Sequence, residues 1–364
     1  MNATEQQQAE QIKSALQQVV DRYTGLDLVT GKNIQAVTVA GDLAQIELEL
    51  GYPARGYEQE LATAAGQAAA GAEGIGRVEI SIVSNVQAHR IQHGLRRSPE
   101  IRNIIAVASG KGGVGKSTTA VNLALALKAE GAKVGMLDAD IYGPSLPKML
   151  GTHQPPKSRD GEKMMPVPAH GMQSMSIGYL TEEDNPMVWR GPMAVGALKQ
   201  LLNDTEWVDL DYLIVDMPPG TGDIQLTLSQ EVPVSGAIIV TTPQDIALLD
   251  AKKGLSMFES VQVPVLGVVE NMSMHVCSDC GKVEPIFGQG GGESMAAQYD
   301  VPFLGGVPLD MSIRMQVDGG QPSLIAEPEG AVAQAYREIA RKTAAKLSLR
   351  ARDYSDRFPK IVVE

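Results

Sequence analysis

A glycine-rich segment that begins at Gly110 constrains this chain more than any other feature of its sequence. An apolar run at 104–108 leads into Gly-Lys-Gly-Gly-Val-Gly-Lys-Ser-Thr at 110–118, and a stretch rich in Ala and Leu follows. The segment fits the pattern G-x-x-x-x-G-K-[ST] in the strand–loop–helix order that a phosphate-binding loop requires. Its glycines allow the backbone N–H groups to converge on phosphate oxygens at the start of a helix. The segment therefore predicts a nucleotide-binding α/β domain.

The residues expected around the nucleotide are Gly110, Lys111, Gly112, Gly113, Val114, Gly115, Lys116, Ser117 and Thr118. Lys116 is predicted to place its charge at the β and γ phosphates of ATP, and the Ser117 hydroxyl to ligate Mg²⁺. A structural glycine-rich turn is the alternative. It is disfavoured because the pattern stands between a predicted strand and a predicted helix.

Acidic side chains end two other apolar segments. Asp138 and Asp140 close residues 134–140, and Asp216 closes residues 213–216. Ligands of doubly wound parallel sheets bind beyond the carboxyl ends of the strands, where these acids are expected to gather. We assign Asp216 to the Mg²⁺ environment, as in a Walker B segment, and Asp140 to orienting the attacking water. A helix-capping role is the open alternative for Asp138 and Asp140.

Short, mostly apolar runs recur between Gly/Pro-rich turns and helical stretches from residue 103 onward. They lie at 104–108, 133–137, 212–215, 236–240 and 265–269. Strands that are apolar throughout are buried on both faces, which is typical of a parallel sheet covered by helices. The expected fold is therefore α/β: a P-loop NTPase with a mostly parallel, doubly wound sheet.

The first part of the chain has a different pattern. Residues 44–50 alternate strictly between apolar and polar, which predicts a strand with one buried face. The elements expected here are a helix at 5–22, a hairpin of 34–40 and 44–50, a helix at 57–70 and a strand at 77–86. We therefore predict a small α+β domain over residues 1–91, a polar linker over 92–102 and the ATPase domain over 103–364.

Charge and composition exclude several classes of function. The 364 residues carry 31 basic and 43 acidic side chains, a net charge of −12. Because phosphate-backbone binding needs a cationic surface, we expect no nucleic-acid partner. No apolar run approaches the ~18 residues of a membrane span, and the polar amino terminus lacks the signal-peptide pattern. We therefore expect a cytoplasmic protein that does not bind membranes.

Lys111 is an unusual residue at the second position of the glycine-rich loop. The form Lys-Gly-Gly-Val-Gly-Lys-Ser at 111–117 resembles the deviant Walker A loop of the MinD, ParA and nitrogenase-iron-protein group of ATPases. In that group the additional lysine reaches the nucleotide of the partner in a homodimer. A cation delivered by dimerisation would stabilise the charge that builds on the leaving phosphate. The alternative is a solvated lysine on a mobile loop.

Both cysteines of the chain, Cys277 and Cys280, stand in one Cys-x-x-Cys motif. A thioredoxin-like redox pair usually opens a helix, whereas Gly281 follows this motif directly. A zinc site within one chain needs two further ligands, with only His275 and scattered acids nearby, and a structural disulfide is unfavourable in a reducing cytosol. An iron–sulfur cluster needs four thiolates, which two chains around a two-fold axis would supply. This interpretation is favoured because Lys111 also indicates a dimer.

Together these segments closely resemble the Mrp/ApbC family of iron–sulfur carrier P-loop ATPases. The resemblance covers essentially all of residues 103–340, and its segments lie at 106–127, 135–151, 188–193, 211–223 and 269–293. It implies a homodimer that holds a [4Fe–4S] cluster between its subunits and passes it to acceptor apoproteins, with ATP binding and hydrolysis. It also implies that Asn271 reads adenine through its side-chain amide, and a turn-forming role is the alternative.

The region before the linker is similar to the small MIP18-like (DUF59) domain, on residues 41–56 and the order of its elements. That similarity implies an adaptor role. Two other functions stay open. A MinD/ParA-like positioning ATPase would need a basic or bulky amphipathic anchor, whereas the helical stretch 331–349 has mostly Ala opposite its basic side chains. A cluster-bridged reductase usually takes one cysteine from each of two loops, whereas here both lie in one.

Overall fold

The computed structural model describes residues 3–159, 161–181, 191–277 and 279–353. Part of the 188–193 segment of the family resemblance, and residue 278 between the cysteines, lie outside these ranges. The described chain divides after Gln87 into a smaller unit, which also contains Ala344–Leu349, and a larger unit. The predicted linker 92–102 belongs to the larger unit, where the buried Gln92 amide donates to the carbonyl of Ser229 at 2.7 Å.

The smaller unit has the predicted α-β-β-α-β order. Its elements are α1 (Ala3–Leu16), β1 (Ile34–Ala40), β2 (Leu43–Leu50), α2 (Glu58–Ala69) and β3 (Arg77–Ser84). β2 pairs antiparallel with β1 and parallel with β3. The first helix is shorter than the predicted 5–22. Its pattern stops because Val20 pairs with Asp27 across a turn and Asp21 is buried, where it accepts a 2.8 Å hydrogen bond from the Tyr52 hydroxyl.

The larger unit contains an eight-stranded sheet in the order β13-β10-β9-β4-β8-β5-β7-β6. The strands are β4 (Ile101–Ala108), β5 (Val134–Asp138), β6 (Val167–Ala169), β7 (Met172–Ser176), β8 (Leu210–Asp216), β9 (Gly236–Thr241), β10 (Val265–Glu270) and β13 (Phe303–Gly306). Neighbouring strands pair in parallel except that β6 runs antiparallel to β7. The predicted parallel sheet is confirmed, and β4 lies at its centre.

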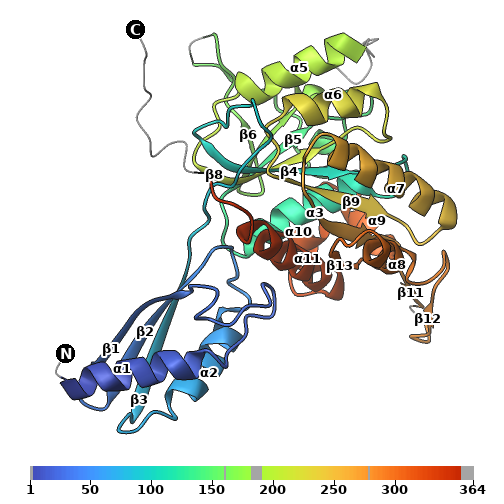
Figure 1. Cartoon of the computed structure of the whole chain (residues 1–364). Helices are drawn as coiled ribbons and strands as arrows, with labels where there is room; N and C mark the ends of the chain where they lie inside the picture. The colour runs from blue at the N-terminus through green and yellow to red at the C-terminus, as the bar shows by residue number, and fades with distance from the viewer. Residues whose placement is uncertain (1–2, 160, 182–190, 278, 354–364) are drawn as a thin grey trace. The chain divides into compact units, whose positions relative to one another are not determined.

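Helices cover both faces of this sheet (Figure 1). They are α3 (Lys116–Ala129), α4 (Leu146–Met149), η1 (Ile177–Tyr179), α5 (Gly191–Asn203), α6 (Asp223–Glu231), α7 (Asp245–Ser260), α8 (Gly291–Gln298), α9 (Met311–Asp318), α10 (Ser323–Ala326) and α11 (Ala331–Ser348). One core packs α5, α6 and α7 against alternate residues of the strands, and α3 and α11 lie on the other face. α3 is buried nearly all round, which explains why its sequence is apolar on every side. None of the helices in the described ranges is long and apolar enough to cross a membrane.

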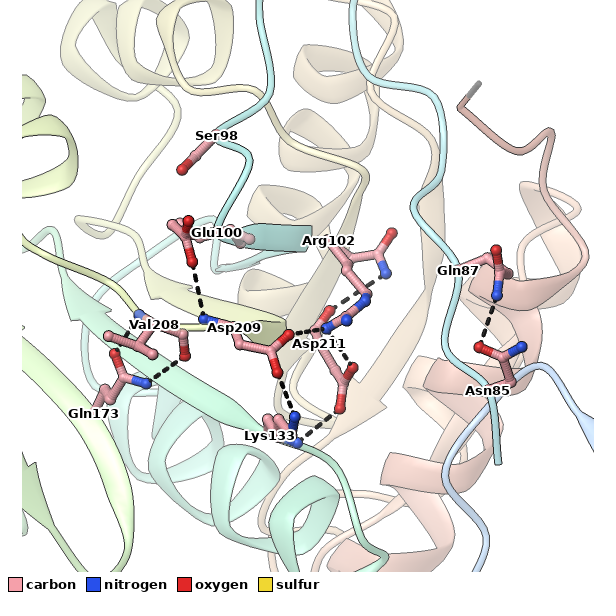
Figure 2. Close-up of polar contacts among 12 residues, drawn as sticks. Asn85, Gln87, Ser98, Glu100, Arg102, Lys133, Gln173, Val208, Asp209 and Asp211 are labelled. Atoms are coloured by element: carbon pink, nitrogen blue, oxygen red, sulfur yellow. Dashed lines mark hydrogen bonds and ion pairs between the residues drawn. The ribbon is translucent and has the colours of Figure 1, made fainter. Parts of the chain in front are cut away.

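A network of ion pairs lies at the amino ends of β4, β5 and β8 (Figure 2). Arg102 of β4 lies 2.9 Å from Asp209 and 3.0 Å from Asp211, both measured from its Nη1 to a carboxylate oxygen. Lys133 also contacts Asp209, and its backbone N–H donates to Asp211 at 2.8 Å. The pairs that Asp209 makes are exposed and contribute little individually, whereas Asp211 is only 16% exposed. A cavity of about 790 Å³ beside Trp207 opens near this end too, away from the carboxyl ends where ligands of this fold bind.

Candidate functional site

The carboxyl ends of three central strands bring the predicted phosphate-binding residues together. The register of the sheet places Asp138 beside Asp216, and β4 delivers the loop that ends at Lys116. The Lys116 Nζ lies 2.5 Å from Asp216 Oδ1 and 3.1 Å from the Ser117 hydroxyl oxygen. Because the side chains of Lys116 and Asp216 are only 6% and 2% exposed, this is a buried ion pair. The site thus holds a buried cation, a hydroxyl and carboxylates within one small volume.

The glycines of the loop are required by close approaches of other segments. Gly113 and Gly115 both have φ near +81°, in the left-handed region that favours glycine. A Cβ atom on Gly110 would overlap the backbone of Asp250 in α7, and one on Gly115 would overlap the side-chain amide of Asn271. The motif therefore shapes the loop and also seats it against two elements more than 100 residues further along the chain.

Asp138 organises the segment that follows β5. Its buried carboxylate accepts hydrogen bonds from the backbone N–H groups of Asp140, Ser145 and Leu146 at 3.1, 3.1 and 3.2 Å. The Ser176 hydroxyl donates a fourth at 3.0 Å. Burial, and then the neighbouring Asp216, raise the pKa of Asp138 to about 7. α4 begins at Leu146 and Ser145 occupies its N-cap position, so Asp138 accepts from the amino end of this helix without itself being the N-cap residue.

Asp140 and Lys111 lie at the rim of the site. Burial raises the pKa of Asp140, whereas the Lys116 ammonium acts in the opposite direction, as expected of a carboxyl group near that cation. Lys111 is half-buried, and its ammonium makes no hydrogen bond or ion pair within the described parts of the chain.

The backbone carbonyl of Ser109, just before the loop, accepts from the N–H of Gly220 at 2.9 Å. That contact ties the segment after Asp216 to the loop.

Two residues at the carboxyl end of β10, Glu270 and Asn271, contact other segments of the site. The Asn271 amide donates to the Val114 carbonyl at 2.9 Å, so in this structure it supports the loop, and its reading of adenine stays a prediction. Glu270, which sequence reasoning missed, accepts from the N–H of Gly292 at 2.6 Å and so positions the start of α8. Its signal was the same as that of Asp138 and Asp216, an acid at the carboxyl end of an apolar strand.

A two-stranded hairpin carries both cysteines, between β11 (His275–Val276) and β12 (Val283–Glu284). The N–H of Cys277 donates to the carbonyl of Lys282, and the N–H of Gly281 to the carbonyl of Cys277, both at 2.9 Å. Gly281 has φ of +70°, which explains the glycine directly after the motif. The turn leaves Cys277 half-buried and Cys280 exposed, and both are free thiols.

The hairpin favours the thiolate form of one cysteine. Backbone hydrogen bonds from Cys280 and Asp279 to the Cys277 sulfur lower the pKa of that thiol. Thiolates are the form that binds metal. Among the residues described, no group of three His, Cys, Asp or Glu side chains is placed to hold a metal ion. His275 directs its Nδ1 to the carbonyl oxygen of Leu309, 3.1 Å away. The described part of one chain therefore offers two thiols at this point.

The parallel sheet and its phosphate-binding loop define a P-loop NTPase. A family model described as NUBPL iron-transfer P-loop NTPase matches residues 100–344, and one described as iron-sulfur cluster assembly protein matches residues 9–82. The chain belongs to this iron-transfer family of P-loop NTPases and carries the cluster-assembly domain before it. The predicted family and fold class are confirmed.

Relatives with curated names agree with the family. A Haemophilus influenzae protein named iron-sulfur cluster carrier protein is 49% identical over 347 residues, 95% of this chain and 94% of its own length. An Escherichia coli protein of the same name is 63% identical over 248 residues, 68% of this chain and 67% of its own. A nucleotide-binding protein from Archaeoglobus fulgidus, solved with ADP, is 37% identical with a TM-score of 0.56, and covers 64% of this chain and 90% of its own.

Proposed function

We propose that this chain is an ATP-dependent carrier of iron–sulfur clusters. Two copies hold one [4Fe–4S] cluster between their cysteine hairpins and pass it to acceptor apoproteins. The observation that carries the proposal is the display of two free thiols, Cys277 and Cys280, at one hairpin of a chain with no other cysteine. A cubane cluster takes four thiolates, so a two-fold partner completes its site. The names of the relatives support this cargo.

The residues around the nucleotide each have a proposed role in ATP binding or hydrolysis. The loop N–H groups donate hydrogen bonds to the phosphates of ATP. When ATP binds, the Lys116 ammonium leaves Asp216 and contacts the β and γ phosphates. The Ser117 hydroxyl and the Asp216 carboxylate are hard oxygen donors of the kind that Mg²⁺ prefers, so the residues fit that cofactor. Asp140 orients the water that takes up the γ-phosphoryl group, which leaves ADP and phosphate. Lys111 reaches the nucleotide bound to the partner subunit and stabilises the charge that builds on its leaving phosphate.

The positioning-ATPase alternative needs an anchor, and the C-terminal helix does not provide one. Ala333, Tyr336, Ile339 and Ala340 of α11 are at most 1% exposed. The weakly apolar face of this helix is therefore packed within the protein, and it has no apolar stripe left to insert into a lipid surface.

The test measures iron, sulfide and zinc per chain across the size-exclusion profile of anaerobically reconstituted protein. The wild type should carry about four irons per dimer and none in the monomer fraction. Cys277→Ser and Cys280→Ser each remove two of four thiolates from the dimer, so each should lose nearly all iron. Lys282→Ser, at an exposed side chain of the same hairpin, is the matched control and should retain it. Stoichiometric zinc in a monomer fraction would contradict the proposal.

A further inference from the structure

The three-stranded sheet of the smaller unit ends in a long and regular edge strand, β3. This strand pairs in parallel with β2 over all eight of its residues, Arg77–Ser84, with no break in register. Within the described ranges β3 has no second neighbouring strand, because the order of the sheet is β1-β2-β3. β1, at the other edge, is interrupted by a shift of register between Ile34 and Ala36. Proteins commonly protect edge strands by keeping them short, bulged or interrupted by Pro, and β3 has none of these protections.

The backbone groups on the free side of β3 belong to its even-numbered residues. The N–H groups of Arg77, at the start of the strand, and Asn85, directly after it, donate to carbonyl oxygens at the two ends of the β2 segment, at 3.0 and 2.8 Å. The peptide groups of a strand point alternately to its two sides. The N–H and C=O groups that point away from β2 are therefore those of Val78, Ile80 and Ile82. They form a row to which a further strand can bind.

The side chains along this edge differ between the two faces of the sheet. α1 and α2 pack on one face, and on it Val78, Ile80 and Ile82 are only half-buried, because no further strand covers them in the described chain. On the open face Glu79 is exposed and accepts a 2.9 Å hydrogen bond from the Gln45 amide. A strand added at this edge would therefore meet apolar side chains on one face and acidic ones on the other.

The charge of the smaller unit specifies the sign of the partner. Residues 1–87 contain 11 acidic and five basic side chains. β2 and β3 place Glu47, Glu49 and Glu79 on the open face, and Arg77 is the one basic residue in these two strands. Pairing of two copies through this edge would bring like charges together, which disfavours self-association. The edge fits an extended segment in which basic residues alternate with apolar ones.

We propose that the free edge of β3 docks an acceptor apoprotein through an extended segment of alternating basic and apolar residues. The segment pairs with the outward N–H and C=O groups of β3. Its apolar side chains lie beside Ile80 and Ile82, and its basic side chains lie beside Glu79. The inference rests on the proposed function, because an acceptor is required only if the chain passes a cluster on. It gives the smaller unit, which contains no cysteine, a role in selecting the acceptor.

The first experiment measures the binding of a labelled probe peptide, Lys-Val-Lys-Val-Lys-Val-Lys, to the full chain without cluster, by fluorescence anisotropy. Ile82→Pro removes an outward N–H group, and proline is tolerated at such edge positions. Glu79→Lys reverses the charge beside the added strand. We expect each variant to raise the dissociation constant at least about tenfold. Glu10→Lys, the same charge change at an exposed side chain of α1, is the matched control and should bind like the wild type.

A second probe separates strand pairing from attraction between charges. The same peptide N-methylated at all its peptide bonds retains its lysines but cannot pair by either edge, so it should bind the wild type at least about tenfold more weakly. Equal binding of the two probes would show adhesion by charge alone and overturn the proposal. If circular dichroism shows that Ile82→Pro does not fold, Glu79→Lys and the methylated probe still decide the result.

The second experiment tests whether the partner is an acceptor. Cluster transfer from the loaded chain to an apoferredoxin that carries the probe sequence at its carboxyl end should be at least about threefold faster than to the unmodified apoferredoxin. Ile82→Pro should remove this difference and retain ATPase activity and iron per chain. Probe binding without faster transfer would overturn the acceptor assignment. A wild type without a bridging cluster would defeat the carrier proposal, whereas the anisotropy measurements would still decide the β3 edge.

Discussion

The ammonium of Lys116 meets two demands, because it neutralises Asp216 in this structure and is assigned to the phosphates of ATP. The pair is nearly inaccessible, so neither charge has water as an alternative partner. Removal of one member of such a pair typically costs more than the pair contributes, because the other charge is left buried. A substitution of Lys116 therefore alters both ATP hydrolysis and the free energy of unfolding. A second variant is needed to separate the two effects.

We predict that Lys116→Ala abolishes ATP hydrolysis and lowers the free energy of unfolding by about 3–5 kcal/mol. Lys116→Ala combined with Asp216→Asn should regain most of that stability and stay inactive. Lys111→Ala, whose ammonium has no described partner, should unfold like the wild type and bind nucleotide yet lose hydrolysis. Urea denaturation and phosphate release provide the measurements. Hydrolysis by Lys111→Ala at the wild-type rate would refute the trans-acting lysine.

Contacts of single residues also differ in how far apart in the chain the two partners lie, and only the local ones could be predicted from the sequence. The spacing around Lys116 predicted the loop because every residue of that motif is a chain neighbour. The hydrogen bond from Asn271 to Val114 joins residues 157 positions apart, and no local pattern encodes it. Three of the donors to Asp138 follow it within eight residues, whereas the Ser176 hydroxyl, 38 positions away, reaches it through the pairing of β5 with β7.

Among the elements, α3 and α11 are joined by a buried ion cluster. Glu130, at the end of α3, is 1% exposed, and its Oε1 lies 3.1 Å from Arg341 and 4.0 Å from Arg337, both on α11. α3 begins at the nucleotide loop, so this cluster holds the far end of the helix that positions Lys116. The buried Glu130 carboxylate is compensated by these arginines, while Arg341 also lies 3.6 Å from Glu338 and Arg337 lies 3.7 Å from Glu329.

We predict that Glu130→Gln lowers the free energy of unfolding by about 3 kcal/mol, since the buried Arg341 then loses its buried carboxylate partner and keeps the partly exposed Glu338. Arg314→Ala, which breaks an exposed pair with Asp318 on α9, is the control and should cost less than about 1 kcal/mol. Urea denaturation of both variants at neutral pH tests the difference. Equal midpoints for the two would show that the buried cluster does not stabilise the α3–α11 contact.

For the whole molecule, the division into two units makes a prediction about truncation. Every residue assigned to the nucleotide or the cluster lies in the larger unit, between residues 88 and 343. The cut belongs after Gln87, because the N–H of His89 donates to Asn103 at 3.1 Å and Gln92 donates to Ser229. Deletion of residues 1–87 should therefore preserve ATPase activity and cluster binding per folded chain.

The truncated chain should also be less stable, because Ala344–Leu349 belongs to the deleted unit and the fully buried Leu347 would be uncovered. A companion Leu347→Ser in the truncated chain should reduce its aggregation without altering activity. Phosphate release and iron per chain, with light scattering, measure these effects. Iron lost from a well-folded truncated chain would contradict this division of labour.

The sequence by itself determined the fold class, the phosphate-binding loop, the acids at the strand ends and the Cys-x-x-Cys motif. These features follow from local spacing and from apolar periodicity, which act over a few residues. Only the tertiary structure decided that α7 packs against Gly110 and that the Asn271 amide supports the loop. These relations depend on the order of strands in the sheet, which places segments more than 100 residues apart in van der Waals contact. No local pattern in the chain carries that order.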